Sequence, residues 1–112
     1  GGAGNDTLIG GRGDDVISGS SGSDTFKFME TTFDGHADFG NDIIVDFHPG
    51  EDTIEIDASF FTGPLQNAIG YDVKGNVTIT VDSGNVITLS GVSQETMLAH
   101  IADIHLTTTV LV

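Results

Sequence analysis

Glycine-rich polar stretches and short apolar runs alternate at a fixed period through the first quarter of the chain. Divided into nines, residues 1–27 read GGAGNDTLI, GGRGDDVIS and GSSGSDTFK, and Gly-Gly-any-Gly-any-Asp precedes each apolar run, with Ser20 replacing one glycine. Glycine allows the positive φ angles of a tight turn, and the apolar run that follows can form a very short strand. The pattern predicts a repeated unit of turn and strand.

The eighth place of each nine-residue block is apolar, and we expect its side chain to point into a core. The block at 28–36 has lost the pattern, whereas the block at 37–45 regains it, with Gly40 at the fourth place and Asp42 at the sixth. With this later block included, the residues expected to point inward are Leu8, Ile17, Phe26 and Ile44.

Two successive nonapeptides are expected to form one flattened coil, because one turns on one side and the next on the other. Residues 18 apart then lie on the same side, which stacks Asp6, Asp24 and Asp42 and places Asp15 opposite. Carboxylates and turn carbonyls together are the oxygen ligands that a hard cation prefers, and calcium is the foremost candidate.

Residues 43–112 contain fewer glycines and carry ordinary strand and helix signals. We expect strands at 43–45, 53–56 and 103–106, a hairpin of 77–81 with 86–89, and a short helix at 94–99 capped by Ser93. The residues expected to form the core are Phe26, Phe28, Ile43, Ile54, Ile56, Val77, Ile79, Leu89, Leu98 and Ile101.

The charge balance limits the possible partners. Seventeen acidic residues face three basic ones among 112 residues, for a formal net charge of −14. So few bases cannot form the basic patch that a nucleic acid or an anionic membrane requires, so the charge favours cations as partners. The absence of cysteine excludes disulfides and thiolate metal sites. The sequence has neither an apolar run long enough to span a membrane nor a common catalytic motif, and we expect no enzyme.

The three repeats in register resemble the RTX (hemolysin-type) calcium-binding repeats. The segment GNDIIVDFHPGEDTIEID, residues 40–57, is similar to the segment that ends the repeat block of secreted RTX proteases and lipases. The resemblance implies an all-β fold, with a right-handed parallel β-roll followed by a β-rich C-terminal cap that includes one short helix. It divides the chain into a calcium-binding β-roll at 1–57 and a capping and secretion region at 58–112.

The same resemblance implies that Ca²⁺ is the cofactor. The carboxylate ligands it implies are Asp6, Asp15 and Asp24, with Asp42 and Asp52 completing the last sites, and Asp52 falls one place outside the nine-residue frame. The carbonyl ligands are expected near Gly2, Gly4, Gly11, Gly13 and Gly22.

Two places in the repeats do not fit a ligand role. The fourth block has Phe33 at the sixth place and Asp34 after it, which weakens the expectation of a site above Asp15. Asn5 and Asp14 hold the fifth place and are expected to face solvent, so Asp14→Ala is expected to have almost no effect or to stabilise slightly by reducing repulsion.

For function, the resemblance implies a module that folds on extracellular Ca²⁺ and supports the folding and type I secretion of a larger protein. Its partners would be calcium ions, the upstream domains of that protein and the secretion machinery. Two alternatives stay open: a calcium-dependent carbohydrate-binding or adhesin module, and the non-catalytic tail of a protease or lipase. The coil beginning at Gly1 has no turn beneath it, and we expect either further repeats upstream in the larger protein or self-association of the isolated fragment through this open end.

Overall fold

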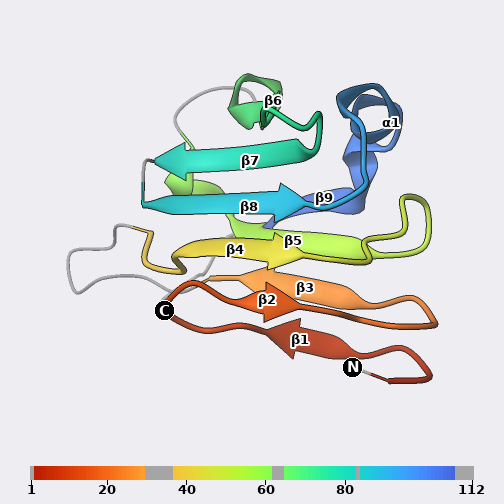
Figure 1. Cartoon of the computed structure of the whole chain (residues 1–112). Coiled ribbons are helices and arrows are strands. Elements are labelled where there is room, and N and C mark those ends of the chain that lie inside the picture. The colour runs from red at the N-terminus through yellow and green to blue at the C-terminus, as the bar shows by residue number, and fades with distance from the viewer. Residues whose placement is uncertain (1, 30–36, 62–64, 83, 108–112) are drawn as a thin grey trace.

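The computed structural model describes residues 2–29, 37–61, 65–82 and 84–107, which form two facing β-sheets (Figure 1). One sheet has the order β1 (Thr7–Ile9), β3 (Thr25–Phe28), β5 (Thr53–Asp57) and β9 (Ile104–Thr107). The other has the order β2 (Val16–Ile17), β4 (Asn41–Ile44), β8 (Asn85–Leu89), β7 (Val77–Asp82) and β6 (Ile69–Tyr71). All neighbouring strands are parallel except the β6–β7 and β7–β8 pairs, which are antiparallel.

The chain winds between the two sheets as a flattened coil, as the repeat pattern predicts. It passes from β1 in one sheet to β2 in the other and returns to β3, which lies beside β1 with Leu8 opposite Phe26 (Figure 1). Glycine-rich turns precede these strands. Glycines such as Gly4 and Gly13 adopt the positive φ angles that a tight turn requires, 96° and 93°. The expected all-β roll with one short helix is confirmed.

The stacking order of the aspartates differs from the expected one. Strand β4 pairs with β2 and β5 pairs with β3, so Asp42 lies over Asp15 and Asp52 lies over Asp24. The expected stack of Asp6, Asp24 and Asp42 is therefore wrong. The physical reason is that β4, which the fifth block forms, is the next described strand after β3 and pairs with β2, so Asp42 falls on the side of Asp15 and not on that of Asp24.

The core contains most of the residues expected from the sequence. The buried ones among them are Phe26, Phe28, Ile54, Ile56, Val77, Ile79 and Leu89, and Ile101 packs against the core while partly buried. At the eighth place of the repeats, Ile17, Phe26 and Ile44 are buried and Leu8 is partly buried.

Two expected core residues are exposed instead. Ile43 is 40% exposed, because strand alternation turns its neighbours Asp42 and Ile44 inward. Leu98 is 46% exposed, because helix α1 (Gln94–Ala99) buries the adjacent Met97.

The C-terminal segment continues the two sheets of the repeats. Strand β8 pairs in parallel with β4 and β9 pairs in parallel with β5, while β7 and β6 close one end of the five-stranded sheet. Ser93 caps α1 as expected, since its side chain accepts a hydrogen bond from the N–H of Thr96. Three short 3₁₀ helices, Ala58–Phe60, Leu65–Ala68 and Ile101–Asp103, complete the described elements. The functional division at residue 57 stays a prediction.

We expect Gly40→Ala to destabilise the protein more than Gly75→Ala, although both glycines have nearly the same φ of about 86° and 85°. An added Cβ at Gly40 would overlap the backbone carbonyl of Gly13 in the turn below, whereas one at Gly75 would meet nothing within 4 Å. Both variants carry left-handed strain of roughly 1–2 kcal/mol. The overlap adds about 1–3 kcal/mol for Gly40 alone. Urea unfolding in calcium measures both, and equal losses would contradict close stacking of the turns.

Candidate metal centre

The glycine-rich turns lie at two opposite ends of the roll. The turns that lead into β1, β3 and β5 lie at one end, and those that lead into β2, β4 and β8 lie at the other (Figure 1). Aspartates end most of these turns, directly before the strands. They form a three-level stack, defined as Asp6, Asp24 and Asp52, and a two-level stack, defined as Asp15 and Asp42.

Each upper carboxylate in a stack is bound to the backbone of the aspartate beneath it. Oδ1 of Asp24 accepts the N–H of Asp6 at 3.0 Å, and Oδ1 of Asp52 accepts the N–H of Asp24 at 2.9 Å. In the two-level stack, Oδ1 of Asp42 accepts the N–H of Asp15 at 2.8 Å. These bonds fix the carboxylates along the axis on which the turns are stacked.

The second carboxylate oxygen, Oδ2, is buried without a hydrogen-bond partner in the described structure at four positions: Asp6, Asp15, Asp24 and Asp42. An unpaired buried carboxylate oxygen is costly, because no water replaces the hydration it has lost. A bound cation is the natural partner for such oxygens, since it offsets both the charge and the missing coordination.

Glycines at the first place of the repeats leave room beside these unpaired oxygens. A Cβ added at Gly10 would lie 2.9 Å from Oδ2 of Asp15, and one at Gly19 would overlap Oδ2 of Asp24. The turn therefore folds its first residue back onto its sixth. This explains why the pattern begins with glycine, and it makes the residues present a good fit to a metal-binding turn.

The electrostatics of the two-level stack also fit a cation site. The pKa of Asp42 is raised to about 6: burial is the largest cause, the hydrogen bond from the N–H of Asp15 acts in the opposite direction, and the negative charges of Asp15 and Asp14 raise it further. The Asp42 carboxylate is thus ionised at neutral pH at a cost that a nearby positive charge would remove.

Backbone carbonyls have to supply the remaining ligands. Across the described part of the chain, no three side chains of Asp, Glu, His or Cys come together as a metal site. The glycines expected to contribute carbonyls all have positive φ: Gly2, Gly4, Gly11, Gly13 and Gly22. The carbonyl of Gly4 lies against Gly22 and that of Gly13 against Gly40, so these carbonyls point toward the turn above. Their role as ligands, like that of the aspartates, stays a prediction.

Asp52 differs from the other stacked aspartates, because both of its oxygens are bonded. Oδ1 accepts the N–H of Asp24, Oδ2 accepts the N–H of His48 at 2.8 Å, and the His48 Nδ1 lies 3.4 Å from Oδ2. Asp52 therefore closes the three-level stack through hydrogen bonds. Its role as a calcium ligand is a prediction that these bonds make less favourable.

The fifth place of the repeats has a structural role that the sequence analysis missed. Asn5 and Asp14 are exposed as expected, but the Oδ1 of Asn5 accepts the N–H of Ser23 at 2.8 Å. Likewise, the Oδ1 of Asp14 accepts the N–H of Asn41 at 2.9 Å. These side chains hold one turn to the next, so we now expect Asp14→Ala to destabilise the protein slightly.

Three further side chains hold the turns in place and were not identified from the sequence. Asn85 accepts the N–H of Gly40 at 2.9 Å, and Asp103 accepts the N–H of Gly50 at 2.7 Å. These contacts span 45 and 53 residues, and no local pattern signals them.

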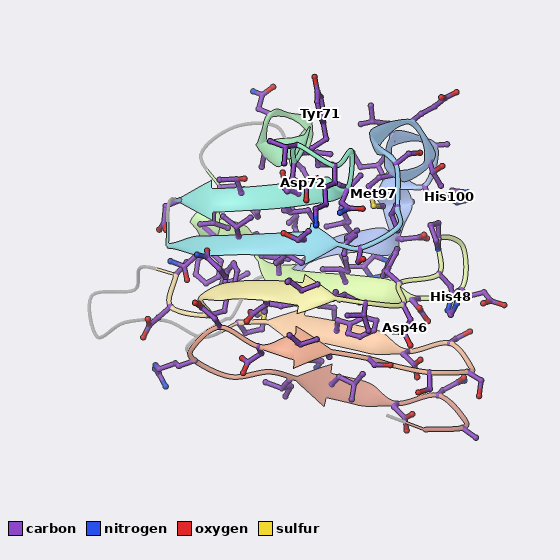
Figure 2. All side chains as sticks on the ribbon, viewed as in Figure 1. Asp46, His48, Tyr71, Asp72, Met97 and His100 are labelled. Carbon is purple, nitrogen blue, oxygen red and sulfur yellow. The ribbon has the colours of Figure 1, made fainter. Side chains whose placement is uncertain are left out.

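The third of them, Asp46, does stand in the repeat frame, at the first place of a sixth block, which is a signal that could have been used. It lies beside the turn that leads into β3 (Figure 2). Its carboxylate accepts hydrogen bonds from the hydroxyl of Ser18 and the N–H groups of Gly19 and Ser20, at 2.6, 3.0 and 2.9 Å. Burial acts to raise the pKa of Asp46, but these hydrogen bonds outweigh burial and lower the pKa below its ordinary value.

We expect Ser20→Gly to stabilise the protein. Ser20 has a φ of 64° without being glycine, and its N–H bond to Asp46 does not depend on the side chain. Relief of the left-handed strain, less the entropy cost of glycine, leaves a gain of about 0.5–1 kcal/mol. The matched control is Ser21→Gly, because Ser21 is also exposed but lacks a positive φ. Thermal unfolding should rank Ser20→Gly above wild type and Ser21→Gly at or below it, and the reverse order would contradict the strain.

Comparison with known proteins identifies the class of this repeat. A family model described as the RTX calcium-binding nonapeptide repeat (4 copies) matches residues 1–26. This segment consists of RTX calcium-binding repeats, and Ca²⁺ is the ion that such repeats bind. The repeat family is a calcium-binding module rather than a catalytic one. No curated protein matches the sequence.

The fold also matches a solved structure beyond the repeats. The crystal structure of the extracellular lipase LipA from Serratia marcescens superposes with a TM-score of 0.64 over 96% of this chain, at 21% sequence identity. The chain spans 20% of the length of that lipase chain, so the match concerns the β-roll architecture and not the whole protein. Among the helices of the described structure, none is long and apolar enough to cross a membrane.

Proposed function

We propose that this chain is a calcium-dependent folding module of a larger secreted protein, and that it folds outside the cell on binding Ca²⁺. The observation that carries the proposal is the set of four buried aspartate oxygens without hydrogen-bond partners, arranged in two stacks of glycine-rich turns. A folded chain with these oxygens unliganded is penalised, and a folded chain with calcium beside them is not.

The charges and the glycine content determine in which direction calcium shifts the balance between the folded and unfolded states. Without metal, the stacked carboxylates repel one another in a chain of net charge −14, and sixteen glycines lose much conformational entropy on folding. Each calcium ion brings two positive charges and connects two turns that are distant in the sequence. The unfolded state is therefore favoured where calcium is scarce, and the folded state where it is millimolar.

This switch suits export in an unfolded state through a type I secretion channel. The match to RTX repeats and the extracellular location of LipA support a secreted protein. The module itself is proposed to be non-catalytic, and its partners are calcium ions, the secretion machinery and the other domains of the larger protein.

Secretion of a fused reporter tests the proposal. A reporter placed before residue 1 is expressed in cells that carry a type I secretion system, in media with millimolar calcium or with a chelator. We expect export in both media, and protease resistance of the module only with calcium. A matched variant in which Asp6, Asp15, Asp24 and Asp42 are all changed to Asn should be exported but stay protease-sensitive. Protease resistance in chelator, or no export of the fusion, would contradict the proposal.

A further inference from the structure

Gly19 lies directly against the unpaired carboxylate oxygen of Asp24. Both residues are buried, and a Cβ added at Gly19 would overlap Oδ2, Cγ and Cβ of Asp24. Oδ2 of Asp24 is one of the four oxygens without a hydrogen-bond partner among the described residues. A shift of the Gly19 backbone therefore changes the room around the oxygen that an ion beside Asp24 would bind.

Asp46 fixes this backbone from the next turn of the three-level stack. Its Oδ1 accepts the N–H of Gly19 at 3.0 Å, and its Oδ2 accepts the hydroxyl of Ser18 at 2.6 Å and the N–H of Ser20 at 2.9 Å. The low pKa of Asp46 keeps this carboxylate ionised at neutral pH, and hydrogen bonds to an ionised acceptor are stronger than those to a neutral one. Three such bonds to consecutive residues hold Gly19 in one position.

The equivalent place in the two-level stack holds an alanine. In the nine-residue frame, Ala37 stands at the first place of the fifth block and Asp46 at the first place of the sixth. The turns of these two residues lie over the turns that begin with Gly10 and Gly19. Gly10 also lies against an unpaired oxygen, since an added Cβ would be 2.9 Å from Oδ2 of Asp15. A methyl group accepts no hydrogen bond, so Ala37 cannot hold Gly10 as Asp46 holds Gly19.

Groups that orient a metal site from outside its ligand shell change metal affinity without touching the metal. We propose that Asp46 is a positioning residue for the ion beside Asp24: it does not bind the ion, but it fixes Gly19 and thereby sets the affinity and the size selectivity of that site. Selectivity between cations of equal charge depends on the size and flexibility of the site, so a freed Gly19 discriminates less between them. This role of Asp46 rests on the calcium-dependent folding proposed above, with Asp24 as a ligand.

Calcium and strontium titrations of Asp46→Ala, followed by circular dichroism, test the positioning role. Strontium carries the same charge as calcium and is larger, so the ratio of the strontium midpoint to the calcium midpoint of folding reports how closely the site fits calcium. We expect Asp46→Ala to raise the calcium midpoint by up to about tenfold, as loss of a group outside the ligand shell does at other metal sites. The strontium midpoint should rise less, so the ratio of the two midpoints falls toward one.

Asp46→Asn distinguishes a positioning residue from a direct ligand. Its side-chain oxygen still accepts the N–H of Gly19, whereas a direct calcium ligand would lose its charge in this variant. We expect Asp46→Asn to keep a ratio of midpoints close to that of the wild type. A ratio that falls as far as in Asp46→Ala would overturn the positioning role in favour of direct ligation.

Asp72→Ala is the matched control. Asp72 also accepts three hydrogen bonds, from the N–H of Lys74 at 2.9 Å and from the N–H and Nδ2 of Asn76 at 3.0 and 3.3 Å. It lies in the turn between β6 and β7, which contains none of the stacked aspartates (Figure 2). The control removes the same charge and the same number of these bonds. Loss of stability alone should raise both midpoints by the same factor, so the ratio should stay that of the wild type.

Amide hydrogen exchange in the calcium-folded protein gives a second measure, and the N–H groups of Gly19 and Ser20 should exchange faster in Asp46→Ala than in Asp72→Ala. If Asp46→Ala folds with neither ion, Ser18→Ala takes its place, because it removes only the hydroxyl that donates to Asp46. A smaller fall in the ratio is then expected.

An unchanged ratio, or the same fall in Asp72→Ala, overturns the positioning role and leaves the calcium-dependent folding intact. A wild-type chain that does not fold with calcium overturns both.

Discussion

In a calcium chelator the protein is expected to lose its β-sheet circular-dichroism signal, and to regain it as free calcium rises to millimolar levels. The reason is the set of buried Oδ2 atoms of Asp6, Asp15, Asp24 and Asp42, which have no protein partner in the described structure. Each such group costs about 1–3 kcal/mol when buried and unsatisfied. Together these costs are comparable to the whole stability of a small domain, which is about 5–15 kcal/mol.

Magnesium at the same concentration is the control for this calcium titration. It requires a small octahedral site and gives up its water ligands reluctantly, whereas carboxylates and turn carbonyls form a larger and more adaptable site. We expect magnesium to leave the protein largely unfolded. A native spectrum in chelator alone, or equal folding with magnesium, would contradict the calcium switch.

Replacement of Asp24 by Ala is expected to raise the calcium concentration needed for folding more than any other single carboxylate change. Asp24 is the middle member of the three-level stack, and its side chain is 1% exposed. The variant loses the acceptor for the N–H of Asp6 and one of the four unpaired oxygens. A loss of about 3 kcal/mol or more is expected for such a buried, bonded charge, and the calcium titration by circular dichroism measures it as a shifted midpoint.

Three further variants separate the effect of losing the carboxylate charge from the effect of losing its hydrogen bond. Asp6→Ala removes an unpaired oxygen at the end of the stack but breaks no side-chain hydrogen bond within the described residues, so its effect should be smaller. Asp24→Asn keeps an Oδ1 acceptor for the N–H of Asp6 and loses the charge, so it isolates the part due to the metal. Asp14→Ala loses one exposed hydrogen bond to Asn41, which is worth about 1 kcal/mol. A midpoint for Asp24→Ala equal to that of Asp6→Ala would contradict the central role of Asp24.

The stacking also explains which residues of the candidate site could be recognised before the structure was known. Asp6, Asp15, Asp24 and Asp42 stand at the sixth place of a regular repeat, and all four carry the unpaired oxygens. Asp52 stands outside the frame, and its carboxylate is bonded to His48 and Asp24. The aspartates that stand in the nine-residue frame thus carry an unpaired oxygen, whereas Asp52, which stands outside it, has both oxygens bonded and is the uppermost member of its stack.

Residues from distant parts of the sequence could not be recognised in the same way. Asn85 and Asp103 bind the turns of Gly40 and Gly50 because β8 and β9 continue the two sheets above the repeats. No spacing rule relates them to the nonapeptides. Their contribution depends on which strands the C-terminal segment adds to the two sheets, and that is a property of the assembled fold.

The sequence by itself determined the unit of this fold. The glycines at turn positions, the sixth-place aspartate and the eighth-place apolar residue act within a single repeat, because φ preference and side-chain alternation are local properties. The structure confirmed that unit in β1, β2, β3 and β4.

The tertiary structure decided which turns are stacked and which apolar residues are covered. Asp42 lies over Asp15 because β4 pairs with β2, so counting residues in nines gives the wrong side. Ile43 and Leu98 are exposed because neighbours on the same element occupy the buried positions. Pairing between coils is a long-range property, since it depends on how many half-coils the chain completes and not on the content of any one repeat.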